Sequence, residues 1–250
     1  MQFLAFLSND QPIFAFQLEI LATYLHIDTT GSIATIGLSK DREILAISQN
    51  EHSNTHAEFV QVSIQQLCKQ IGVSLSNIDA IVNVMGPGSY TGLRVGLASA
   101  KGIAFAINKP IIGLNALKLL SLKAQKDLIS TTKEENNSII FSMIDARRME
   151  VFGGWYNSQS LESIKEGPMI LTESFVSEMT IQFDKIYCIG NGIEKSKSII
   201  NDPKFHFIES SYRINEMIEL ADSKWNAKVF EDLAYSTPLY LKDFYNNQHP

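Results

Sequence analysis

The stretch VMGPGSYTGLRVGLASAKGIA, residues 84–104, places a glycine-rich turn directly before an apolar helical pattern. A short apolar run over 80–85 precedes it and predicts a buried strand. The helix is expected from about Thr91 to Asn108, because the residue before Pro110 is disfavoured in helical conformation. A strand, a glycine-rich turn and a helix in this order are typical of an α/β fold.

The glycine-rich loop from Gly86 to Gly92 has two interpretations. Glycines next to a helix N-terminus let backbone amides approach an anion, and Ser89 and Thr91 add hydroxyl donors, which favours a phosphate cradle. In the other interpretation Pro87 and the glycines form only the turn, and Thr91 caps the helix. The glycine spacing matches neither a Walker loop nor a dinucleotide fingerprint. The residues alone leave both interpretations open.

The expected helix also carries a stripe of small residues at four-residue spacing, which comprises Gly92, Gly96, Ala100 and Ala104. Glycine in an exposed helix costs up to about 1 kcal/mol relative to alanine, so close packing should offset the loss. The stripe allows another backbone to approach closely, either from the chain's own sheet or from a second protein.

Strand patterns and then a helical pattern precede this segment in the chain. The run YLHIDTTGSIATIGL over 24–38 predicts a β-hairpin, and EILAIS over 43–48 predicts a third strand. Thr55 and Glu58 have the spacing of a capping box, and Gly72 ends the helix that follows. The apolar residues of that helix recur at helical spacing and are Val60, Ile64, Leu67 and Ile71.

The same order of elements begins again in the second half. A third helix is expected over 115–126, and the polar run 129–138 is the candidate for a flexible connection. After it, SIIFSMIDARRMEVFGGWY over 138–156 predicts a strand, a charged turn and a strand, which suggests an internal duplication. YCIGNG over 187–192 follows a buried strand and leads into a helix, and one or two helices are expected over 215–234. Strands alternating with helices in both halves predict sheets covered by helices.

Charged residues recur in the two expected hairpins. Asp28 and Asp145 each end a first strand, where two carboxylates would suit a magnesium ion in a kinase-like ATPase. Alternatively each aspartate organises its own turn through side-chain to backbone hydrogen bonds, and the residue pattern favours this role. Arg147, Arg148 and Glu150 in the second hairpin are interpreted as a solvated, charged turn.

Histidine and cysteine give no pattern typical of a metal site. His56 lies one helical turn before position 60, where a second histidine would complete an i, i+4 ligand pair, but that residue is Val60. Cys68 lies in an apolar helical pattern and Cys188 in an apolar strand pattern, without ligand or disulfide spacing. We therefore expect two reduced core cysteines and no bound metal.

Composition limits the kinds of partner. The 250-residue chain has 21 basic and 27 acidic residues, which gives a net charge of −6. This balance is the opposite of that in an autonomous nucleic-acid binder, so any RNA contact is expected to come from a partner. The apolar residues 1–25 have no basic start and are interrupted by polar residues and Pro12, so we expect no membrane span and a cytoplasmic location.

Four segments occur in the order and at the spacing of the TsaB (YeaZ) family: LHIDTT at 25–30, HAE at 56–58, the glycine-rich segment at 84–104 and IDARRMEVF at 144–152. The chain strongly resembles that family over about residues 23–156 and more loosely beyond. The resemblance implies an actin-like, sugar-kinase-like (ASKHA) α/β fold of two related subdomains. It also implies a cytoplasmic role in forming threonylcarbamoyladenosine beside the anticodon of tRNA.

The resemblance also sets the expected domain boundaries. They are an N-terminal extension at 1–22, an N-terminal subdomain at 23–128 and a C-terminal subdomain at 139–250. Members of the family usually begin one or two residues before the first strand, which leaves residues 1–22 as an extension of undetermined order.

A comparison with the related catalytic family, TsaD, implies a silent partner protein. TsaD carries two metal-binding histidines on the helix that here contains His56, and Val60 at the second position removes that site. The resemblance thus implies a scaffold and activator with no catalytic residue, cofactor or metal. It implies a heterodimer with a TsaD-like transferase subunit through the helices at 56–71 and 91–108, joined by a TsaE-like ATPase, with tRNA contacted only indirectly.

The small-residue stripe is then expected to face outward. The residues expected at the interface are His56, Val60, Ile64, Leu67, Gly92, Val95, Gly96, Ala100 and Ala104. Two other classes of function remain as alternatives. One is an enzyme, either a metal-dependent peptidase or an actin-like ATPase; the missing second histidine argues against the first, and Gly190-Asn191-Gly192, which is not a Gly-Gly pair, argues against the second. The other is a self-associating homodimer, which is also possible for the chain when it is alone.

Overall fold

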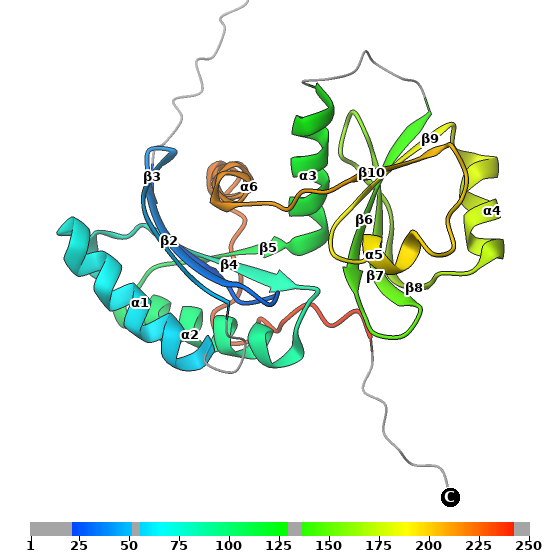
Figure 1. Ribbon diagram of the computed structural model, residues 1–250. Coiled ribbons are helices and arrows are strands. Elements are labelled where there is room, and N and C mark those ends of the chain that lie inside the picture. The colour runs from blue at the N-terminus through cyan, green and yellow to red at the C-terminus, as the bar shows by residue number, and fades with distance from the viewer. Residues whose placement is uncertain (1–21, 52–55, 130–136, 243–250) are drawn as a thin grey trace, which may run out of the picture.

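The computed structural model of the chain describes residues 22–51, 56–129 and 137–242 (Figure 1). The expected extension at 1–22 therefore lies outside the described residues except for its last residue. Thr55 of the expected capping box and most of the expected connection also lie outside them. Within these three ranges, no helix is long and apolar enough to cross a membrane.

The first half forms a five-stranded sheet in the order β3-β2-β1-β4-β5. Its strands are β1 (Thr23–Asp28), β2 (Ala34–Lys40), β3 (Glu43–Asn50), β4 (Ala80–Gly86) and β5 (Ile111–Asn115). β1 pairs antiparallel with β2 and parallel with β4, so it is the central strand, and all of its residues are buried. The predicted hairpin and third strand are confirmed.

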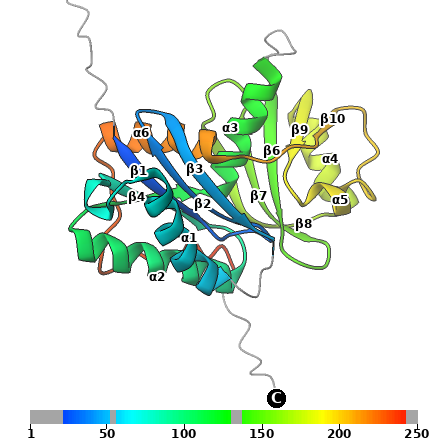
Figure 2. The same ribbon diagram turned by 60° about the vertical axis from the view of Figure 1, so that its left-hand side comes forward.

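Helices cover both faces of this sheet; they are α1 (His56–Ile71), α2 (Tyr90–Ile107), α3 (Ala116–Ile129) and α6 (Ile214–Asn226). Alternate residues of β1 show how the faces divide, because successive side chains of a strand point to opposite sides. Leu25 and Ile27 pack with residues of α1 and α2, whereas Tyr24 packs with residues of α3 and α6. Figures 1 and 2 show α1 and α2 next to each other on one side of the sheet, with α6 on the other.

The second half repeats this topology. Its strands are β6 (Ser138–Asp145), β7 (Glu150–Asn157), β8 (Ser163–Ile170), β9 (Lys185–Ile189) and β10 (Phe205–Ile208). Their order, β8-β7-β6-β9-β10, matches the first sheet strand for strand. The pairings also correspond, since β6 lies between antiparallel β7 and parallel β9. The internal duplication suggested by the two hairpins is therefore confirmed.

Several of the described elements have no counterpart in the sequence analysis, among them β5, β8, β10 and α4 (Glu173–Gln182). β8 is an edge strand whose residues are mostly exposed, so its sequence SIKEGPMI has little apolar periodicity. α4 fully buries only Met179, which leaves its helical pattern equally weak. The remaining short elements are α5 (Ile193–Ser196) and η2 (Leu75–Asn77), a single turn of 3-10 helix.

The C-terminal part of the chain returns to the first half. α6 packs on β1 and β5, the Glu231 amide donates to the Ile111 carbonyl at 2.9 Å, and the Leu239 amide donates to the Met85 carbonyl at 2.8 Å. α6, Glu231 and Leu239 thus pack with the first sheet, although they were expected in the subdomain at 139–250. The apolar pattern of a helix predicts that it is buried, but it does not say which sheet it covers.

Candidate functional site

The glycine-rich loop packs against the turn that joins β1 to β2. The Ser89 amide donates to the Thr30 carbonyl at 2.7 Å, and the Thr29 hydroxyl donates to the Gly92 carbonyl at 2.7 Å. A Cβ atom on Gly88 would lie 2.5 Å from the Thr30 carbonyl oxygen, and one on Gly92 would lie 1.9 Å from the Thr29 carbonyl oxygen. The glycines are therefore needed for the close approach of two backbone segments.

This packing favours the second interpretation of the loop, in which the glycines form a turn. The Ser89 amide already has Thr30 as its acceptor, and the Gly92 amide donates to the Ser89 hydroxyl at 3.3 Å. These two amides are therefore not available to bind an anion. The loop therefore forms a turn and a packing contact. The residue that caps α2 is Ser89, whereas Thr91 was the cap expected in the second interpretation.

Asp28 is buried at the end of β1, and both of its carboxylate oxygens accept hydrogen bonds. Oδ1 accepts from the Thr30 amide at 3.0 Å and from the Thr30 hydroxyl at 2.7 Å, and Oδ2 accepts from the Tyr212 hydroxyl at 2.8 Å. Burial raises the pKa of Asp28, and the bonds from Thr30 and Tyr212 oppose that rise. Tyr212 packs against the core clusters of both halves, so its bond to Asp28 ties the two halves together.

Asp145 occupies the corresponding place at the end of β6. Its Oδ1 accepts from the Arg147 amide at 2.7 Å, two residues further along, just as Asp28 accepts from Thr30. Partial burial acts to raise the pKa of Asp145, but the bonds from Lys195 and the Arg147 amide outweigh it and lower the pKa. The turn role is confirmed for both aspartates. Within the described residues, neither belongs to a group of three or more His, Cys, Asp or Glu side chains that could hold a metal ion.

Replacing Tyr212 with phenylalanine is expected to lower the free energy of unfolding by about 1.5–3 kcal/mol, the range for a hydrogen bond to a charged group. The folded pKa of Asp28 lies above its unfolded value, so the cost of ionising the buried carboxyl appears as the pH rises through the folded pKa. The variant lacks one donor to the carboxylate, which makes this cost larger. The loss of stability should therefore be greatest at neutral pH and shrink on acidification.

Denaturant titrations at neutral pH and at the lowest pH at which the wild type stays folded measure this difference. An equal loss of stability at both pH values would show that the Tyr212 hydroxyl does not stabilise the charged form of Asp28.

The small-residue stripe of α2 faces inward, contrary to the outward-facing stripe that we expected. All of its members are buried, namely Gly92, Gly96, Ala100 and Ala104. A Cβ atom on Gly96 would lie 2.4 Å from the Thr29 hydroxyl oxygen and 3.1 Å from the Asn83 side-chain oxygen, because β1 and β4 pass close to the helix. The stripe therefore packs on the chain's own sheet.

The other residues expected at the interface also serve the chain's own core. His56, Val60, Ile64 and Leu67 are buried, and Val95 is partly buried against the cluster that contains the last three. These side chains hold α1 and α2 on the sheet and do not form an outer surface. Position 60, where a metal pair would need its second histidine, is filled by an apolar core residue.

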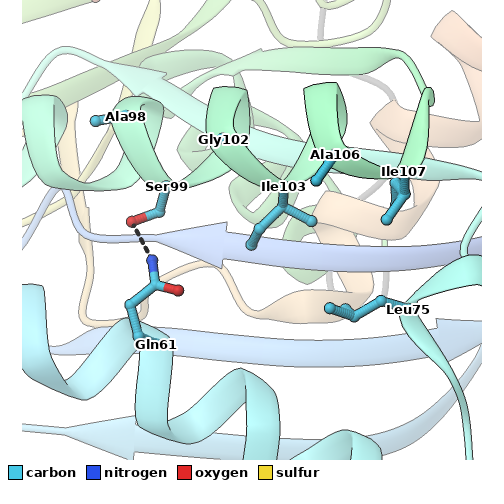
Figure 3. Close-up of a pocket in the computed structure, with 8 residues that line it drawn as sticks. All are labelled: Gln61, Leu75, Ala98, Ser99, Gly102, Ile103, Ala106 and Ile107. Carbon is cyan, nitrogen blue, oxygen red and sulfur yellow. Dashed lines mark hydrogen bonds between the residues drawn. The ribbon is translucent and has the colours of Figure 1, made fainter.

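The outer faces of α1 and α2 leave an opening between them that the sequence analysis did not identify (Figure 3). It has a volume of about 210 Å³ and is lined by Gln61, Leu75, Ala98, Ser99, Gly102, Ile103, Ala106 and Ile107. The Gln61 amide group donates to the Ser99 hydroxyl at 3.0 Å, which joins the two helices at one end. A neighbouring hollow of about 490 Å³ shares Gln61, Leu75 and Ile103 and also contains Cys68. We call these two hollows together the helix-pair groove.

The sequence of α2 contains a pattern that could have indicated this groove. Ala98, Gly102 and Ala106 form a second stripe at four-residue spacing, and no atom lies within 4 Å of an ideal Cβ on Gly102. The helix thus has small residues on two faces. The inner stripe is flanked by the buried Leu93 and Leu97, and this flanking marks it as the face toward the sheet.

The two cysteines differ in burial. Cys188 in β9 is fully buried, and burial raises the pKa of its thiol, which confirms the expected core role. Cys68 on α1 is partly buried at the helix-pair groove, and burial raises its pKa as well.

Comparisons with known proteins agree with this architecture. A family model described as TsaD, tRNA N6-adenosine threonylcarbamoyltransferase, matches residues 44–244. The tRNA threonylcarbamoyladenosine biosynthesis protein TsaB of Buchnera aphidicola is 29% identical over 235 residues, which cover 90% of this chain and 100% of the relative. TsaB of Haemophilus influenzae is 30% identical over 176 residues, covering 68% and 72%. The structure of YeaZ from Pseudomonas aeruginosa matches with a TM-score of 0.70 at 23% identity, covering 88% of this chain and 100% of that one. The fold is the actin-like α/β fold of two related subdomains that the sequence resemblance implies.

Proposed function

The chain belongs to the TsaB (YeaZ) family, and from this we propose that it is the non-catalytic partner and activator of a TsaD-like transferase in threonylcarbamoyladenosine modification of tRNA. A TsaE-like ATPase joins this assembly in our proposal. The tRNA is bound mainly by the partner, because a chain with a net charge of −6 is a poor RNA binder by itself.

The helix-pair groove is the observation that carries this proposal. The transferase family model matches most of this chain, so we infer that the transferase has a related helix pair. Two related folds can associate through equivalent surfaces, much as identical subunits do across a two-fold axis. The groove offers small residues on α2, at which a second helix can approach closely. A homodimer through the same surface is the form that we propose for the chain in the absence of the transferase.

The described residues also support a role without catalysis. Both carboxylate oxygens of Asp28 accept bonds from within the chain, and the amides of Ser89 and Gly92 are bonded internally. These bonds give both groups a structural role within the chain, as expected for a turn and a helix start.

Thiol labelling tests the groove in the wild-type chain. We expect a maleimide to react under native conditions with Cys68, at the groove, and not with the fully buried Cys188. The reaction is run at mildly alkaline pH, because burial raises the pKa of Cys68 and only the thiolate reacts. The TsaD-like subunit from the same organism should slow the labelling strongly.

Two controls complete this experiment. Cys68→Ser should abolish native labelling, and Cys188 should react only after denaturation. Unchanged labelling of Cys68 in a complex that co-sediments would exclude the groove as the interface. A transferase subunit that does not co-sediment with the chain would contradict the partner role itself.

A further inference from the structure

Positive charge and tyrosine gather where the two halves meet, outside the helix-pair groove. The residues are Tyr90, Arg94, Arg147, Arg148, Tyr240 and Lys242, which we call the arginine–tyrosine rim. They come from the start of α2, the β6–β7 loop and the C-terminal segment, which crosses from the first half to the second (Figure 1).

The β6–β7 loop presents two arginines in an uncommon backbone conformation. Arg147 and Arg148 have φ angles of 69° and 49°, in the left-handed region that few residues with side chains adopt. Both are exposed, and neither guanidinium has a hydrogen-bond or ion-pair partner in the part of the chain that the structure describes. The positive charge of both side chains is therefore available to a partner.

The loop is held in place by a lysine beneath it. The Lys195 ammonium donates to the Asp145 carboxylate at 2.5 Å, to the Arg148 carbonyl at 2.7 Å and to the Glu150 carbonyl at 2.9 Å. The Lys195 side chain is 14% exposed, whereas the Asp145 side chain is 48% exposed, so the lysine lies on the inner side of the loop. A loop fixed in this way loses little freedom when its arginines bind a ligand, which favours binding.

The C-terminal segment brings an aromatic cluster to the same rim. The Arg94 guanidinium lies 4.0 Å from the centroid of the Tyr90 ring, and its Nε donates to the Tyr240 hydroxyl at 3.0 Å. The two tyrosine rings are 5.3 Å apart, and Tyr90 and Tyr240 are 36% and 37% exposed. Lys242 then forms an ion pair with Glu150 at the start of β7, which joins this cluster to the arginine loop.

We propose that the arginine–tyrosine rim contacts the tRNA in the assembled complex, an inference that rests on the proposed function. Guanidinium groups form bidentate hydrogen bonds with phosphate, and exposed aromatic rings stack on unpaired bases. RNA presents phosphates and base faces together, so guanidinium groups and tyrosine rings on one surface suit it. The rim adds a local contact to the larger RNA surface of the partner, because the charge of the whole chain keeps it a weak binder alone.

The test measures tRNA affinity of the complex between this chain and the transferase subunit over a range of salt concentrations. Arg147→Gln combined with Arg148→Gln should weaken binding and reduce the slope of log affinity against log salt by about 1–2, since each phosphate contact contributes about 0.7–0.9. Lys40→Gln combined with Lys228→Gln is the matched control. Both lysines are exposed and outside the rim, and the change in net charge is the same.

A second variant separates stacking from charge. Tyr240→Leu should weaken tRNA binding by about fivefold or more through lost stacking, while the salt slope stays as in the wild type. Melting temperatures of each variant subunit establish that it is folded before its affinity is compared.

The outcomes distinguish this inference from the proposed function. If the wild-type heterodimer does not form in sedimentation, the proposed function is contradicted. If it forms, but the double arginine variant binds tRNA with unchanged affinity and salt slope, only the rim assignment is overturned. The complex with that variant could also fail to bind the ATPase subunit while its tRNA affinity stays unchanged. This result would overturn the rim assignment as well and would indicate that the rim binds an acidic protein surface.

Discussion

Replacing Gly92 with alanine is expected to lower the free energy of unfolding by about 3 kcal/mol or more, at the upper end of the range for overpacked cores. The added Cβ would lie 1.9 Å from the Thr29 carbonyl oxygen and 3.1 Å from its carbonyl carbon. Both are backbone atoms, so no side-chain rotation relieves the clash. The turn and the loop are also joined by the Thr29 bond to Gly92 and the Ser89 bond to Thr30, which would have to break for them to separate.

Gly102 provides the matched control on the same helix. It is exposed, and an ideal Cβ there has no atom within 4 Å, so Gly102→Ala should be neutral or stabilise the chain by up to about 1 kcal/mol. Thermal unfolding measures both variants, and the Gly92→Ala variant should melt about 6–12 °C below the wild type, at about 2–4 °C per kcal/mol. Equal melting temperatures for the two variants would show that the loop and the turn are not packed as tightly as described.

Replacing Gly102 with leucine is expected to weaken association with the TsaD-like subunit by about 5- to 150-fold, which corresponds to about 1–3 kcal/mol of overpacking. The leucine would extend from the outer stripe into the helix-pair groove, where a closely approaching helix would meet it. The melting temperature of the subunit should stay close to that of the wild type, because Gly102 is exposed and an added Cβ there meets no neighbouring atom within 4 Å.

Two further variants control this experiment, which is read by calorimetry and thermal unfolding. Gly96→Leu places the same side chain on the inner stripe, against the Thr29 hydroxyl, and should destabilise the fold instead. Glu178→Leu adds an exposed leucine on α4 in the second half and should change neither property. If the Gly102→Leu variant is folded and binds its partner as tightly as the wild type, the groove is not the interface.

Gly96 and Gly102 show why spacing alone did not predict which face of α2 is buried. Both glycines belong to stripes of small residues at four-residue spacing on one helix, and spacing alone is the same for the two. The position of Thr29 and Asn83 against Gly96 shows that the inner stripe is occupied by the chain's own sheet. The prediction of an outward stripe was wrong for this reason, because small residues contribute little to the apolar pattern from which a buried face is read.

Local features were predictable because they depend on residues close together in the chain. The hairpins that contain Asp28 and Asp145, the helix ended by Gly72 and the internal duplication all follow from alternation, turn residues and caps within a few positions. The family followed as well, because its motifs are short and ordered along the sequence.

Contacts between distant segments were decided only by the tertiary structure. The bond between Asp28 and Tyr212 joins residues 184 positions apart, and α6 covers the first sheet although it follows the second in the chain. The sequence by itself determined most of the strands and helices of the first half, that the halves are related, and to which family the chain belongs. The tertiary structure decided which face of α2 is buried, how the loop amides are bonded and which side chains meet at the junction of the halves. Periodicity predicts that a residue is buried. Which residues it packs against depends on contacts among segments that are far apart in the sequence.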